Sequence, residues 1–192
     1  MTTEFDDLAQ NGAQNEDELC RDIQMSLPDA FWALDYVERY KFGRFNKDFA
    51  LAEDGRAYLF GVVEVPLLEE AGSFTWGVWA EVPREFHDAY VERFQSELAE
   101  GMKAEGTLAN EVPSYDDAFG ARLEIVLHAD RRPSIRILEG SLAKAQAEGL
   151  TLEAHRARDE VLFPPEDEFD EAFDDVDGMA GVPNEGRAWD AL

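Results

Sequence analysis

Alternating hydrophobic and polar positions predict strands in the middle of the chain. The first alternating segment is followed by Asp54-Gly55, a dipeptide that favours a tight hairpin turn. Pro66 marks the end of the second strand, because proline cannot donate a ladder hydrogen bond. Connections between successive strands are short, which favours antiparallel pairing. Strands are therefore expected over residues 49–53, 56–66, 74–82, 122–129 and 134–138.

Apolar residues spaced three and four apart predict helices between and after these strands. One apolar stripe predicts a helix over residues 83–100, which Gly101 ends. Its members are Phe86, Tyr90, Phe94 and Leu98. Shorter helices are expected after Pro28 and over residues 142–148 and 152–161. The predicted fold class is α+β: a mainly antiparallel sheet of about five strands, with helices packed on one face or end.

Both ends of the chain differ in composition from the middle. Residues 1–27 hold seven acidic residues against one arginine, and residues 164–192 hold ten against one. Sparse apolar residues and a high net charge leave such segments with too little surface to bury on folding. We therefore expect a single domain over residues 28–163, between an acidic, mobile N-terminal segment and an acidic, disordered tail.

The chain carries a net charge of −26, from 43 acidic and 17 basic residues. Nucleic acids and anionic membranes are bound through Lys and Arg, so no direct binding to either is expected. The acidity has two explanations: adaptation to a salty cell interior or a bias in composition, and a surface selected to meet a basic protein. A single cysteine, Cys20, excludes an internal disulfide, and the acidic N-terminus lacks a signal-peptide pattern. A cytoplasmic location is expected.

Two glycines in the second and third strands, Gly61 and Gly77, lie opposite each other in the hairpin register that we expect. Facing glycines leave a shallow trough on the sheet. Either Trp79 and Trp32 fill this trough, or it is open to a ligand. Trp76 belongs to the opposite face of the strand, which is assigned to the core.

Five polar residues on or near these strands are candidates for a binding site. Glu64 has the parity of the core face, so it is either a rim residue paired with a backbone group or an arginine, or a desolvated pocket carboxylate. His128 ends the fourth strand and faces outward, and Arg131, Arg132 and Arg136 follow it. These arginines form either an anion-binding turn or a set of partners for the surrounding acids.

No metal-binding or catalytic motif accompanies these residues. His87 and His155 are expected at the surface, and neither an HExxH nor a CxxC motif occurs. A GxSxG elbow and a phosphate-binding P-loop are also missing from the sequence. No metal and no cofactor is therefore expected.

Several segments together resemble a bacterial family known only as domain of unknown function 2199. They are YLFGVVEVP (58–66), FTWGVWAEV (74–82), ARLEIVLHADRRPSIRI (121–137) and LAKAQAEGLT (142–151). The likeness covers about residues 27–163 and supports these domain limits and the sheet, but it implies no activity. The positions that match the family pattern are Glu64, Pro66, Trp76, Gly77, Trp79, His128, Arg132, Pro133, Gln146 and Gly149.

The chain departs from this family at its N-terminal end. Family members often begin with a CxxCGxxH-like knuckle, which implies a small zinc site. The corresponding region here reads NEDELCRDIQMSLPD, with Cys20 as its one cysteine and with no histidine. The histidine of the family's late HPL motif is Ser141 here. A zinc site is therefore not carried over from the resemblance.

These observations favour a non-enzymatic protein-binding domain, such as an acidic inhibitor or immunity-type partner of a basic protein. Phe169 and Phe173 of the acidic tail have the spacing of a short helix that docks on a partner. The alternative is a small-ligand-binding or enzymatic domain that uses a sheet-face pocket around Glu64, His128 and Arg132.

Overall fold

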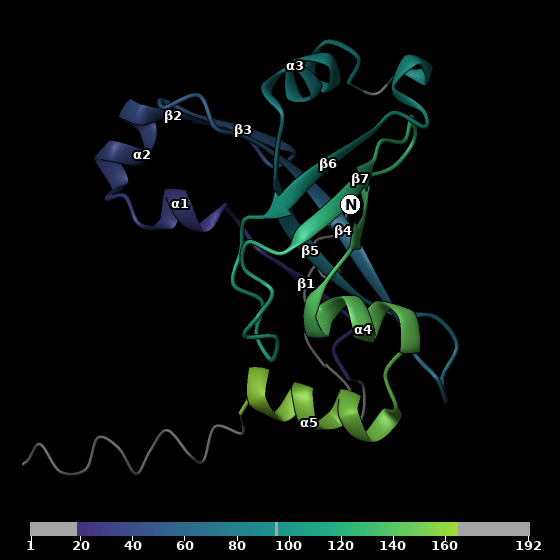
Figure 1. Cartoon of the computed structure of the whole chain (residues 1–192). Helices are drawn as coiled ribbons and strands as arrows, with labels where there is room; N and C mark the ends of the chain where they lie inside the picture. The colour runs from purple at the N-terminus through teal and green to yellow at the C-terminus, as the bar shows by residue number, and fades with distance from the viewer. Residues whose placement is uncertain (1–18, 95, 165–192) are drawn as a thin grey trace, which may run out of the picture.

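The computed structural model describes residues 19–94 and 96–164, which form one sheet with helices around it (Figure 1). The strands are β1 (Asp22–Gln24), β2 (Gly43–Phe45), β3 (Phe49–Ala52), β4 (Ala57–Pro66), β5 (Ser73–Val82), β6 (Lys103–Leu108), β7 (Arg122–Val126) and β8 (Ser134–Ile137). The α-helices are α1 (Asp29–Trp32), α2 (Tyr36–Phe42), α3 (Arg84–Glu92), α4 (Gly140–Glu148) and α5 (Leu152–Leu162). Among these helices, none has the length and apolar character needed to cross a membrane.

Five strands of this sheet close into a ring. β4 pairs antiparallel with β5, and the meander continues through β6 and β7 to β8. β8 then returns to the other edge of β4 and pairs with it in parallel at Val62 and Ser134. β1 adds to β5 in parallel, and β3 and β2 add antiparallel beyond β4. The α+β class is confirmed. The expected sheet of about five strands is too small, because the described sheet has eight strands, and the β1–β5 and β4–β8 pairs are parallel in an otherwise antiparallel sheet.

The structure differs from the predicted elements at two further places, β6 and the end of α3. β6 has the sequence KAEGTL, which lacks large alternating apolar residues, and it forms through backbone pairing with β7. The helix expected over 83–100 ends at Glu92, and Leu98 is exposed rather than part of a buried stripe. The chain must leave the helix to begin β6, and the Gly101 N–H donates to the carbonyl of Leu127 as it does so.

The hydrophobic core fills the inside of the ring. In an antiparallel pair, residues opposite each other share a face, and Val63 lies opposite Trp76 while Val65 lies opposite Phe74. The expected register, with Gly61 opposite Gly77, is wrong by one residue, because Gly61 lies opposite Val78. Such a shift moves every side chain of a strand to the other face. A second buried cluster lies outside the ring and contains Phe31, Ala50, Tyr58, Phe60, Trp79 and Ala109.

Gln146 of α4 completes the closure of the ring. β4 and β8 pair at one position only, so backbone groups beyond it need other partners. The Gln146 side chain accepts from the Ile137 N–H at 2.8 Å and donates to the Ile135 carbonyl at 3.0 Å and the Glu64 carbonyl at 3.4 Å. One amide thus joins α4, β8 and β4.

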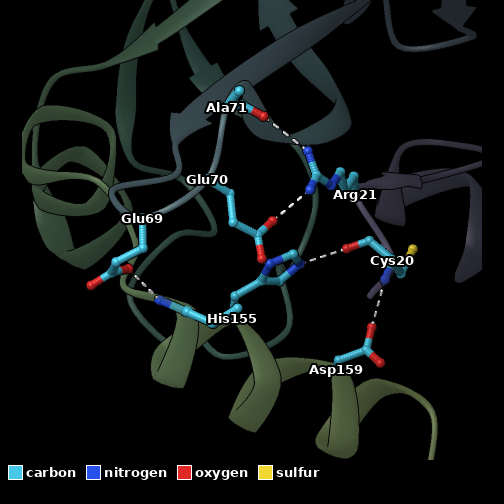
Figure 2. A network of polar contacts seen from close by, with 8 residues as sticks. Cys20, Arg21, Glu69, Glu70, Ala71, His155 and Asp159 are labelled. Atoms are coloured by element: carbon cyan, nitrogen blue, oxygen red, sulfur yellow. Dashed lines mark hydrogen bonds and ion pairs between the residues drawn. The ribbon is translucent and has the colours of Figure 1, made fainter. Parts of the chain in front are cut away.

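The described part of the N-terminal segment is held in the fold, although we expected residues 1–27 to be mobile. β1 lies beside β5, and the preceding residues reach α5 (Figure 2). The Cys20 N–H donates to Asp159 at 2.9 Å, and the Cys20 carbonyl accepts from His155 Nε2 at 2.7 Å. Arg21 donates to the Ala71 carbonyl in the β4–β5 loop. These contacts explain why His155, which we expected at the surface, is buried.

The contacts around Cys20 predict a change in thiol reactivity. Asp159→Ala removes the acceptor of the Cys20 N–H, so residues 19–21 should detach from α5 more often. A net hydrogen bond of about 1 kcal/mol corresponds to roughly a fivefold rise in the labelling rate of Cys20 by a disulfide reagent. Glu160→Ala removes an equal charge from an exposed neighbour and should leave the rate unchanged. Equal rates in the wild type and Asp159→Ala would contradict this account.

The bridging amide of Gln146 predicts a loss of stability. Gln146→Ala leaves the Ile137 N–H and the Ile135 carbonyl without their side-chain partner. The free energy of unfolding in urea should fall by about 1–3 kcal/mol. Lys144→Ala on the same helix affects only an exposed ion pair with Glu148 and should cost less than about 0.5 kcal/mol. If the two substitutions have equal effects, the amide does not hold the ring closed.

Candidate functional site

Two hollows lie side by side at the turn between β7 and β8. The larger has a volume of about 790 Å³ and lies over β4, β8 and α4. The smaller has a volume of about 390 Å³ and reaches α3 and the start of β3. Both are lined by Arg131 and Arg132. Glu64 lines the larger hollow and His128 the smaller, so Arg132 connects the two other residues of the predicted sheet-face pocket.

Arg132 is held in place by residues of three other segments. Its guanidinium lies over the Phe60 ring, 4.4 Å from the centroid, and donates to Gln24 Oε1 at 3.1 Å. It also lies 3.8 Å from a carboxylate oxygen of Asp48. A Cβ at Gly77 would lie 2.5 Å from the Phe60 ring, so the absence of a side chain at Gly77 makes room for this ring. The position of Arg132 therefore depends on Gly77, because a side chain there would displace the Phe60 ring on which Arg132 lies.

The predicted trough between Gly61 and Gly77 is wrong. The register places Gly61 opposite Val78, and a Cβ at Gly61 would meet Ile135 at 2.7 Å and the Pro133 carbonyl at 2.9 Å. Gly61 thus allows the start of β8 to approach β4. Trp32 does not fill a trough either, since it is half exposed on α1.

His128 connects two residues that are distant from it in sequence. Its Nε2 lies 3.0 Å from the Ser134 hydroxyl, and its Nδ1 lies 3.4 Å from a carboxylate oxygen of Glu100. The other oxygen of Glu100 accepts from the Ala129 N–H at 2.8 Å. These hydrogen bonds from Ala129 and His128 lower the pKa of Glu100 below its usual value. A serine, an imidazole and a carboxylate in this order can pass a proton, and here they also fix the turn.

The smaller hollow has polar and aromatic walls. Lys47, Arg131 and Arg132 supply positive charge, and Tyr90 lies among them. Burial raises the pKa of Tyr90 to about 12, and the nearby Asp48 carboxylate acts in the same direction. Tyr90 therefore keeps its hydroxyl proton at neutral pH.

A second candidate surface lies on α1 and α2, beside β2 and β3 and away from α4 and α5 (Figure 1). Its exposed apolar residues are Trp32, Tyr36, Val37 and Tyr40, with exposed fractions of 51%, 72%, 69% and 63%. We call these four residues the aromatic face. The rings of Tyr36 and Tyr40 lie 5.0 Å apart, and the Arg39 guanidinium lies 4.4 Å from the Trp32 centroid. Sequence analysis missed this face, although Tyr36 and Tyr40 have the i, i+4 spacing of neighbours on one helix.

Phe31 and Asn110 connect α1, which carries Trp32 of the aromatic face, to the strands. Phe31 is buried against the edges of Phe45 and Tyr58, with centroid distances of 5.5 and 5.9 Å. The buried side-chain amide of Asn110 accepts from the backbone N–H of Trp79 at 2.8 Å and donates to the Asp29 carboxylate at the start of α1. Both contacts fix the position of α1 relative to β5.

The remaining candidate residues are buried in the fold, line a hollow or lie outside the described residues. Trp76 is fully buried inside the ring, and Trp79 is buried outside it with its indole N–H donating to the Met25 carbonyl. Glu64 is exposed at the wall of the larger hollow. Phe169 and Phe173 lie outside the described residues. The surface position expected for His87 is wrong: its side chain is buried on α3, packed edge-on against Phe49.

Among residues 19–94 and 96–164, no three His, Cys, Asp or Glu side chains come close enough together to hold a metal ion. The candidate surfaces in this part of the chain are the arginine-lined hollows and the aromatic face.

Comparison with known sequences assigns the chain to a family. The family DUF2199, described as uncharacterised proteins conserved in bacteria, matches residues 10–150. No curated protein and no solved structure matches the chain. The match covers most of the ring, including the WGVW segment of β5, and reaches the end of α4. The chain therefore belongs to the DUF2199 family.

Proposed function

We propose that this protein acts by binding another protein and that the aromatic face is the contact surface. The observation that carries the proposal is the exposure of four large apolar side chains within nine residues, Trp32 to Tyr40. Exposed apolar side chains that gather on one surface, as the Tyr36 and Tyr40 rings do at 5.0 Å, are typical of protein–protein interfaces. Tyr, Trp and Arg are also the residue types that most often dominate binding energy, and Arg39 lies against Trp32.

The anchoring of α1 supports a preformed contact surface. Phe31 and Asn110 hold α1 on the ring, and on α2 the Tyr40 ring packs 5.5 Å from the Phe45 ring, so a partner would meet side chains that are already in position. A preformed surface lowers the ordering cost of association. The aromatic side chains also bring large contact area with few rotatable bonds.

The charge of the chain supports a basic partner. A net charge of −26 attracts positively charged proteins over long range and repels further copies of this chain. We therefore propose an acidic inhibitor or immunity-type role, in which the aromatic face supplies the affinity and the overall charge speeds the encounter. We place this role in the cytoplasm, because a protein with one cysteine needs no oxidising compartment.

The second candidate function is small-ligand binding or catalysis at the hollows. The meeting of both hollows at Arg132, next to the contact between His128 and Ser134, favours it. In that case Glu64→Gln or His128→Ala should abolish function while substitutions on the aromatic face have no effect.

The test of the proposed function is a capture experiment with variants. The full chain should retain a protein of high isoelectric point from the native bacterium, and Tyr36→Ala/Tyr40→Ala should lose it. Loss of two anchoring rings should weaken binding by at least about tenfold, or ~1.4 kcal/mol. Phe119→Ala removes an aromatic ring of similar exposure from another surface and should bind like the wild type.

The partner that is identified allows the charge argument to be checked. Association should slow as salt rises, because the Debye length is about 8 Å at physiological ionic strength, while dissociation should change less. Retention of the same basic protein by Tyr36→Ala/Tyr40→Ala would overturn the assignment of the aromatic face. Loss of that protein on removal of residues 165–192 alone would instead assign the contact to Phe169 and Phe173.

A further inference from the structure

The smaller hollow concentrates positive charge in a chain that is strongly acidic. Lys47, Arg131 and Arg132 line it, against the two carboxylates of Asp48 and Asp130. Elsewhere on the described surface, some arginines pair with carboxylates, as Arg56 does with Asp54 and Arg84 with Asp88. The excess of positive charge in this hollow is therefore a local feature, opposite in sign to the whole chain.

Two of the three cations have no hydrogen bond or ion pair within the described residues. Neither Lys47 nor Arg131 lies within 4.0 Å of a carboxylate oxygen there. The charge of Arg131 does lower the pKa of Glu100 over a longer distance. His128, which also contacts Glu100, forms another wall of the hollow. Both cations thus keep donors that a ligand can use.

The third cation is preorganised. Arg132 is fixed by the Phe60 ring and by Gln24, and its contact with Asp48 at 3.8 Å is too long for a hydrogen bond. The negative charge of Asp48 is thus placed against Arg132 at the buried side of the hollow. Lys47, Arg131 and Asp130 are the exposed charged residues of the hollow, so its accessible part carries two cations and one carboxylate.

Neutral donors and an apolar wall complete the hollow. Tyr90 contributes a protonated hydroxyl, and Phe94 lies edge-on to the Tyr90 ring with a centroid distance of 5.4 Å. The volume of about 390 Å³ is in the range of small-molecule sites. A ligand that fits has an anionic group for the cations and a small apolar or aromatic part for Phe94.

We propose that the smaller hollow binds a small phosphate monoester, whose phosphoryl group lies between Lys47 and Arg131 and whose organic part packs on Phe94. A phosphoryl group matches the fork of donors on an arginine and accepts from a lysine as a point charge. This proposal does not depend on protein binding by the aromatic face, which lies on other elements.

The test uses phenyl phosphate as the probe and calorimetry on the full chain. Phenyl phosphate should bind saturably and more tightly than inorganic phosphate, because only the former contacts Phe94. Arg131→Gln and Lys47→Gln should each weaken binding by about tenfold or more, as expected for loss of a charge-assisted hydrogen bond. Neither side chain makes a hydrogen bond that the fold uses, so both variants should keep the thermal stability of the wild type.

A matched control separates a built site from general charge. Arg156 on α5 is exposed and lies outside the hollow, so Arg156→Gln changes the net charge equally and should bind phenyl phosphate like the wild type. Equal weakening by Arg156→Gln and Arg131→Gln would overturn the proposal, as would the absence of saturable binding at about 10 mM probe. Equal affinities for inorganic phosphate and phenyl phosphate would overturn the role of Phe94.

Discussion

The closure of β8 onto β4 is the contact on which the other features of this protein depend. It is made at Val62 and Ser134, next to a glycine that leaves space for Ile135. The pairing is short, and the Gln146 amide extends it by bonding β8 and β4 at once. A closed ring gives the interior residues a surface to pack against on every side. The same short pairing leaves the larger hollow open beside it.

Closure also positions the turn that carries the arginines. β8 begins directly after Pro133, whose carbonyl accepts from the Val62 N–H at 2.8 Å. The turn is therefore fixed at one end by the ring and at the other by Glu100, which bonds Ala129 and contacts His128. Arg132 gains its own support from Phe60. A cationic turn with this many fixed points is positioned before any ligand arrives, which lowers the ordering cost of binding.

The two proposed surfaces would bind their ligands through different interactions. The aromatic face offers apolar area, whose burial contributes roughly 25 cal/mol per Å² and is not screened by salt as an ion pair is. The smaller hollow offers charge in a partly enclosed volume, where an ion pair is stronger than at an open surface. The acidity of the chain works against anions everywhere except at such a local excess of cations. An anion that binds there is therefore selected by position rather than by overall charge.

The sequence determined the elements whose signals are local, and the tertiary structure decided how they face each other. The α+β class, the β3–β4 and β4–β5 hairpins and the last two helices follow from periodicity, from Asp54-Gly55 at the β3–β4 turn and from the cap at Thr151. The WGVW segment and the late QxxG pattern identified the family. The hairpin register was not predicted correctly, because a shift of one residue costs little in local pattern yet exchanges the β4 residues that share a face with Trp76. β6 and β1 escaped notice because their stability comes from neighbours distant in sequence. The candidate site residues divide in the same way, between those suggested by the sequence and those found only in the tertiary structure. The sequence proposed Glu64, His128 and Arg132 as site residues. Glu100, Ser134, Lys47 and Tyr90 come near them only through tertiary contacts, which leave no periodic signal in the chain.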